Sequence, residues 1–217
     1  MKRSAALLVA LLGLLAASAA LADTKPATRP AAAAASPGKP ASAAVDSVAL
    51  LERAVAKDST KFDNLYRLGV LYLDRERMQE ASRVLMKANQ VRPHDIRVLV
   101  NLGVAADAIG HADEAQVFYQ QALDVSPGDS VAMCRLASSK YAQGKYDEAM
   151  TLLRTLIKSK PRSHCAYFTM GVAFADAGIY RDAIRMWHKV IELAPDSPEA
   201  LSAKESIDVL EKFLQGK

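Results

Sequence analysis

The chain of 217 residues is poor in aromatic residues, cysteine, glycine and proline. Phe, Trp and Tyr make up 6% of the sequence, beside ten glycines, nine prolines and two cysteines. A low aromatic content with abundant Ala, Leu, Glu, Lys and Arg favours helices over sheets. The chain also lacks a Gly-rich phosphate loop, a nucleophile elbow and an HExxH motif. We therefore expect a helical protein that is not an enzyme.

The main part of the chain has no excess of positive charge, although the formal net charge is +4. Of the 28 basic and 24 acidic residues, five and one lie in residues 1–44, which leaves 23 of each in residues 45–217. A nucleic-acid footprint needs a basic face. The balance therefore predicts no nucleic-acid partner.

Residues 1–22 have the organisation of a secretory signal peptide. Lys2 and Arg3 precede an apolar run, and Ala20-Leu21-Ala22 provides the small-x-small cleavage pattern. We predict cleavage after Ala22, export to the periplasm of a Gram-negative bacterium, and no membrane span afterwards. The alternative is an uncleaved anchor in the inner membrane that faces the periplasm, since an apolar stretch of about 18 residues is just long enough to span.

Residues 23–44 have the composition of a linker. Four prolines stand among Ala, Ser, Lys and Thr, and such a segment buries too little apolar surface to form a core. It is predicted to be a disordered tether, and the alternative is a Pro-rich ligand for another protein.

A repeat of 34 residues dominates the rest of the chain. A proline, an alanine and a small residue after Leu or Met each recur four times at this spacing. The prolines are Pro93, Pro127, Pro161 and Pro195, the alanines are Ala81, Ala115, Ala149 and Ala183, and the small residues are Gly69, Gly103, Ala137 and Gly171. Several independent columns in one register indicate a repeat architecture.

Each unit is predicted to form two helices joined by a turn. Apolar residues recur at helical spacing in the first half, as in Leu65, Leu68 and Tyr72. A mid-unit glycine such as Gly110 supplies the permissive backbone of a turn. The closing proline cannot continue a helix interior. We expect the small residue of the first helix to let the second helix approach closely.

This pattern resembles the tetratricopeptide repeat, with its Leu-Gly pair, mid-repeat Gly, Ala and closing Pro. The first unit departs from it with Glu76 at the turn glycine, and the third with Ala137 in place of glycine. The resemblance implies an all-α fold, a right-handed superhelical solenoid of four units. These units are 62–95, 96–129, 130–163 and 164–197.

Sequence on both sides extends this array. Residues 45–61 align with a second helix, so they are predicted to form half a repeat. Residues 198–214 carry one apolar stripe and a polar outer side, as a terminal capping helix does. The repeat domain is therefore predicted to span 45–217 and to contain ten helices.

The resemblance places partner binding on the concave surface, along the first helix of each unit. An exposed apolar strip there suits an amphipathic helix or an extended peptide. The alternative is that the strip packs against the protein's own tether or terminal helix. The partner-binding candidates are Tyr66, Val70, Leu73, Val100, Asn101, Val104, Val131, Arg135, Tyr141, Phe168 and Val172.

The two cysteines, Cys134 and Cys165, fall on neighbouring first helices on the groove side. A disulfide suits an exported protein, but helix axes about 8–10 Å apart make its geometry marginal. The sequence leaves open whether they are bridged or are two small groove residues. The four histidines lack metal-site spacing, so no metal or cofactor is expected.

These features predict a protein–protein interaction scaffold in the bacterial cell envelope, with a protein partner of unknown identity. The alternative is a self-associating structural module that forms a homodimer through the helix at 198–214. A solenoid concavity is open, whereas small-molecule sites usually enclose their ligand.

Overall fold

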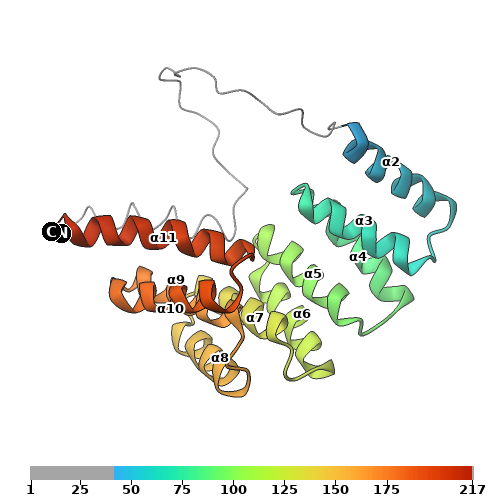
Figure 1. The fold of residues 1–217 in the computed structure, drawn as a ribbon. Coiled ribbons are helices and arrows are strands. Elements are labelled where there is room, and N and C mark those ends of the chain that lie inside the picture. The colour runs from blue at the N-terminus through green and yellow to red at the C-terminus, as the bar shows by residue number, and fades with distance from the viewer. Residues whose placement is uncertain (1–41, 217) are drawn as a thin grey trace, which may run out of the picture.

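The computed structural model describes residues 42–216, and within this range the chain forms ten α-helices and no strand (Figure 1). The predicted signal peptide and residues 23–41 of the predicted linker lie outside the described residues. None of the ten helices combines the length and apolar character that crossing a membrane requires. The helices are α2 (Ser42–Lys57), α3 (Phe62–Asp74), α4 (Met78–Val91), α5 (Ile96–Ala108), α6 (Ala112–Val125), α7 (Ser130–Ala142), α8 (Tyr146–Ser159), α9 (His164–Asp176), α10 (Tyr180–Leu193) and α11 (Pro198–Gln215).

Each predicted 34-residue unit contains two helices. The pairs are α3 with α4, α5 with α6, α7 with α8, and α9 with α10, and they stack in chain order along one axis (Figure 1). The all-α repeat solenoid expected from the sequence is confirmed. Each repeat of 34 residues therefore corresponds to one pair of helices, and the pairs follow one another in chain order.

Within a unit, a small residue of the first helix packs against a large residue of the second. A Cβ atom added at Gly69, Gly103 or Gly171 would overlap the side chain of Leu85, Tyr119 or Trp187, respectively. The four alanines that recur on the second helices are all fully buried. Close packing of this kind explains why the two columns keep small residues.

The turns inside the units share one backbone conformation. Gly110, Gly144 and Gly178 have φ angles of 86°, 77° and 76°, and Glu76 has a φ of 60° at the equivalent position. In the first unit, the amide of Arg77 donates to the carbonyl of Tyr72 at 2.8 Å, which closes the end of α3 in a Schellman-type arrangement. Glu76 therefore adopts a conformation that glycine provides elsewhere at lower cost.

The two flanking helices complete the stack. α2 begins at Ser42, within the predicted linker, and packs against α3, where the Tyr72 hydroxyl donates to Glu52 at 2.7 Å. At the other end, the Ser197 side chain caps α11 by accepting from the amide of Ala200. α11 buries its apolar stripe and leaves Lys204 exposed, as expected for a capping helix.

Candidate binding groove

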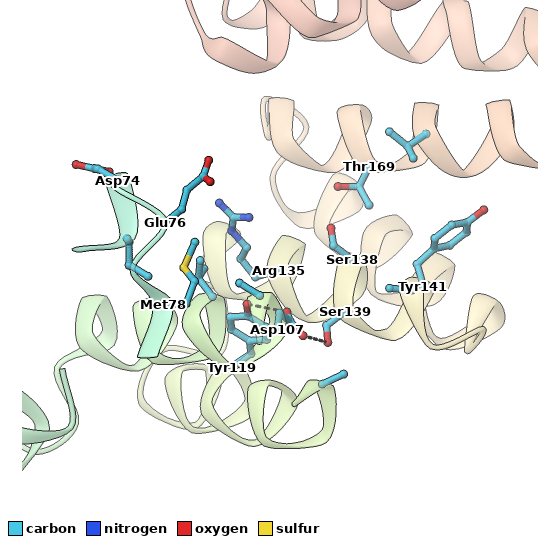
Figure 2. A pocket seen from close by; sticks show the side chains of 16 residues that line it. Asp74, Glu76, Met78, Asp107, Tyr119, Arg135, Ser138, Ser139, Tyr141 and Thr169 are labelled. Atoms are coloured by element: carbon cyan, nitrogen blue, oxygen red, sulfur yellow. Dashed lines mark hydrogen bonds between the residues drawn. The ribbon is translucent and has the colours of Figure 1, made fainter. Parts of the chain in front are cut away.

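One cavity of about 420 Å³ lies along the first helices of the four units (Figure 2). Its lining comes from α3, α5, α7 and α9, together with the α3–α4 turn and parts of α4 and α6. Apolar side chains of Leu73, Met78, Val104 and Val172 form part of this lining. We call it the central cavity.

The central cavity contains five of the eleven residues that the sequence analysis proposed. These are Leu73, Val104, Arg135, Tyr141 and Val172. The other six, Tyr66, Val70, Val100, Asn101, Val131 and Phe168, do not line it. These six residues come from the same four first helices, and we call them the flanking strip. The predicted groove thus consists of the central cavity and this strip.

The flanking strip is only partly accessible. Val131 is 54% exposed, and the Asn101 amide donates to the Tyr66 hydroxyl at 3.5 Å, between α5 and α3. Val100 and Phe168 are 8% and 6% exposed, so the expectation of a continuous exposed apolar strip is wrong at these positions. The physical reason is the stacking itself, because Phe168 belongs to a core cluster that includes Ile207 of α11.

A half-buried carboxylate, Asp107, lies at the floor of the central cavity. It accepts hydrogen bonds from the Tyr119 hydroxyl at 2.9 Å and from the Ser139 hydroxyl at 2.8 Å (Figure 2). Burial raises the pKa of the Asp107 carboxyl group, and these two hydrogen bonds and the positive charge of Arg135 oppose the shift. Burial also raises the pKa of Tyr119. Both of these hydrogen bonds to Asp107 come from hydroxyl groups.

Three acidic residues line the central cavity, with Asp74 and Glu76 at one end and Asp107 apart from them, beside Tyr119 and Ser139 (Figure 2). Asp74 is the last residue of α3, Asp107 lies in the last turn of α5, and Glu76 follows on the α3–α4 turn. Neither helix has a basic residue in its last turn. An acidic side chain at a helix C-terminus is unfavourable, because it meets the negative end of the helix dipole. Arg135 is the only cationic side chain among the residues that line this cavity.

Sequence reasoning missed the acidic end of the central cavity. Asp74 and Glu76 lie at or after the end of a helix, beyond the positions that the repeat pattern assigns to the concave face. One indication was available, because Glu76 stands where the other three units have glycine.

The structure joins Cys134 of α7 to Cys165 of α9 in a disulfide with a Cα–Cα distance of 6.2 Å. This answers the question that the sequence left open. The bond lies toward the N-terminal ends of the two helices, whereas the acidic residues lie at the C-terminal ends of α3 and α5. In residues 42–216 no group of three or more His, Cys, Asp or Glu is arranged to hold a metal ion.

The fold and the cavity together define a helical-repeat solenoid with a concave groove. Three tetratricopeptide repeat models match the chain, over residues 62–95, 108–170 and 166–197, which together cover more than half of it. The chain belongs to the tetratricopeptide repeat family. No curated protein sequence matches it significantly.

Solved structures with the same fold include MamA, TTC0263 from Thermus thermophilus, and YrrB. MamA is 22% identical, with 67% of this chain and 85% of MamA covered and a TM-score of 0.57. TTC0263, a thermophilic tetratricopeptide repeat protein, is 16% identical, with coverage of 74% and 88% and a TM-score of 0.62. YrrB, described as having an unusual peptide-binding site, is 23% identical, with coverage of 76% and 84% and a TM-score of 0.54. At these identities the likeness concerns the fold alone.

Proposed function

We propose that this protein is a protein–protein interaction scaffold that holds a peptide or helix of a partner in its concave groove. The central cavity carries this proposal, because it offers apolar side chains from α3, α5 and α9 beside a small number of polar groups. Such a lining suits a segment with apolar anchors whose orientation is fixed by polar contacts. Membership of a family of interaction modules supports binding as the function in preference to catalysis.

The proposed location is the bacterial cell envelope, and two features support it. Residues 1–22 have the pattern of a signal peptide. The Cys134–Cys165 disulfide suits an oxidising compartment such as the periplasm. Fractionation of cells that express the tagged protein, with intact-mass measurement of the mature N-terminus, tests both the location and cleavage after Ala22.

In-cell crosslinking followed by mass spectrometry tests partner binding. Val104→Glu places a charge in the apolar wall of the central cavity. Val117→Glu is a matched control, because Val117 is 54% exposed on α6 of the same unit and does not line the cavity. We expect the wild type and Val117→Glu to capture the same partner and Val104→Glu to lose it while its helicity is unchanged. Equal capture by both variants would move the binding site away from the cavity.

Self-association through α11 is the second candidate function, and two exposed apolar residues favour it. Leu201 and Val209 are 61% and 44% exposed on this terminal helix. Light scattering at micromolar concentration tests it, with Leu201→Glu/Val209→Glu as the variant. A dimer that dissociates in the variant would support this function, and a monomeric wild type would contradict it.

A further inference from the structure

We propose that the Cys134–Cys165 disulfide sets the position of α9 relative to α7, and with it the width of the central cavity, so that the oxidised protein binds its partner more tightly than the reduced protein. The effect of the bond on geometry needs no partner. Its effect on binding rests on the proposed function.

The disulfide occupies the place in the repeat at which successive first helices meet along the concave face. In chain order, the pairs of residues at this place are Tyr66 and Arg97, Val100 and Val131, and Cys134 and Cys165. Between α3 and α5, the guanidinium carbon of Arg97 lies 4.9 Å from the centre of the Tyr66 ring. Between α7 and α9, the equivalent pair is covalently bonded. One junction of three therefore has a fixed geometry.

This bonded pair lies beside residues that line the central cavity. Cys134 directly precedes Arg135, which lines the cavity from α7. One turn after Cys165, the hydroxyl of Thr169 donates to the Cys165 carbonyl at 3.0 Å, and Thr169 lines the cavity from α9 (Figure 2). The cavity thus has one wall on each side of the bond. A change in the position of α9 relative to α7 therefore changes the cavity.

The polar contacts between α7 and α9 constrain these helices less than the covalent bond does. Near the C-terminal ends of both helices, the Tyr141 hydroxyl donates to Asp176 at 3.1 Å, and water competes for a hydrogen bond of this kind. Near the N-terminal ends, the disulfide holds the two Cα atoms 6.2 Å apart. Breaking the disulfide leaves the hydrogen bond at the opposite ends, so we expect α9 to turn relative to α7.

The curvature of the groove links this junction to binding. In a solenoid, the concave surface follows from the small rotation between each unit and the next. A partner that needs one curvature binds less tightly to a protein that adopts this curvature only part of the time. The disulfide therefore organises the groove before the partner arrives.

Reduction of the disulfide is a two-electron step that needs a dithiol reductant. A thiolate of the reductant attacks one sulfur of the bond, and the second thiol of the reductant then closes its own disulfide. Cys134 and Cys165 are left as two thiols, with both electrons and both protons supplied by the reductant. Because cytosolic thiols are kept reduced, the form that binds more tightly is made in an oxidising compartment.

Distance measurements by electron double resonance test the effect on geometry. Ketone side chains for gadolinium labels are introduced as p-acetylphenylalanine in place of exposed residues. One pair, Val117 of α6 and Lys204 of α11, lies on either side of the α7–α9 junction. The matched control pair, Leu50 of α2 and Val117, lies entirely before this junction. Each pair is measured in the oxidised protein, after reduction with dithiothreitol, and after reoxidation.

We expect reduction to broaden the distance distribution of the pair that spans the junction by about 1.5-fold, and reoxidation to restore it. The control pair should not change, and circular dichroism should show unchanged helicity. An unchanged distribution for the spanning pair would overturn the proposal, because a bond that only adds stability leaves the folded geometry as it is. Equal broadening of both pairs would indicate a general loosening of the solenoid and would also overturn it.

Binding has its own readout. In the crosslinking experiment described above, Cys134→Ser/Cys165→Ser should capture about threefold less partner per molecule than the wild type. The cells are grown well below the melting temperature of the variant, so that both proteins are folded. Failure of both proteins to capture a partner contradicts the proposed function but leaves the distance measurement as evidence for the effect on geometry. Equal capture by both proteins would overturn the link between the disulfide and binding.

Discussion

Glu76 combines an unfavourable backbone conformation with a side chain that lines the central cavity. Its φ of 60° lies in the left-handed region, where a side chain with a Cβ is disfavoured by about 1–2 kcal/mol. The hydrogen bonds that end α3 require this conformation, because the amide of Glu76 donates to Leu73 and that of Arg77 to Tyr72. The backbone of this turn is therefore strained, and the carboxylate it carries lines the central cavity.

Replacing Glu76 with glycine should stabilise the protein. We expect the free energy of unfolding to rise by about 1 kcal/mol, because glycine adopts positive φ without the Cβ clash. Chemical denaturation followed by circular dichroism measures the change. Glu76→Ala is the control, since alanine removes the carboxylate but keeps the clash, and it should gain much less. Equal gains for Gly and Ala would assign the effect to charge and contradict the strain argument.

The carboxyl group of Asp107 should make stability depend on pH. Burial raises its pKa in the folded protein above its ordinary value, so the folded state binds the proton more tightly than the unfolded state. The free energy of unfolding contributed by Asp107 therefore falls as pH rises above the unfolded value of about 3.9. Asn has no carboxyl group, so this loss of stability is absent from Asp107→Asn. The free energy of unfolding of Asp107→Asn minus that of the wild type should therefore be larger at pH 7 than at pH 4. Denaturation at both values tests the sign, and a relative loss would contradict it.

At the scale of the element, the contact between the two helices of a unit depends on one small side chain. Gly103 lies where a Cβ would overlap the Tyr119 ring, and Tyr119 is 1% exposed. Gly103→Val should cost about 1–3 kcal/mol through overpacking and lower the melting temperature. Gly128→Val is the matched control, because a Cβ there meets only the end of Lys160 at 3.9 Å. An unchanged melt for Gly103→Val would contradict the helix register.

The disulfide links α7 to α9 and should stabilise the third and fourth units. It closes a loop of 31 residues, for which the chain-entropy model gives about 2–4 kcal/mol. We expect Cys134→Ser/Cys165→Ser to melt at a lower temperature than the oxidised wild type. A reductant should lower the wild-type melt to that of the double variant and leave the double variant unchanged. A wild-type melt that does not respond to complete reduction would show that the bond adds no stability.

At the scale of the whole molecule, the repeat pattern predicts the number of helices, their order and the residues at their crossings. It does so because small residues, turn residues and prolines are each fixed by local packing or backbone geometry. The exposure of single side chains was harder to predict, because it depends on residues far away in the sequence. Phe168, for example, is buried in a cluster that includes Ile207, nearly 40 residues later in the chain. The positions of Asp74 and Glu76 in the cavity lining were missed because they line the same cavity as Asp107 of α5 only after α3 and α5 have stacked.

A stack of this kind transmits perturbations mainly between neighbouring helices, because each unit contacts only the next. The helix α2 should be the least protected of the ten, since Val48 is its only buried side chain among residues 47–57. One polar link from α2 to α3 is the bond from the Tyr72 hydroxyl to Glu52, and burial together with Glu52 raises the pKa of Tyr72 to about 12. Loss of this link should therefore loosen one end of the solenoid and leave the other unchanged.

Tyr72→Phe tests this locality, because it removes the hydroxyl and keeps the ring that packs in the core. Hydrogen exchange should become several-fold faster at the amides of α2, because a hydrogen bond to a charged group contributes to holding the helix in place. Exchange in α9, α10 and α11 should not change, since these helices pack together at the far end of the stack (Figure 1). Tyr180→Phe, a tyrosine on α10 whose ring packs edge-on against Phe213 at 5.3 Å, is the control at that end. A Tyr72→Phe variant whose exchange rises uniformly in every helix would show that the solenoid opens as a single cooperative unit, and the nearest-neighbour description would then be wrong.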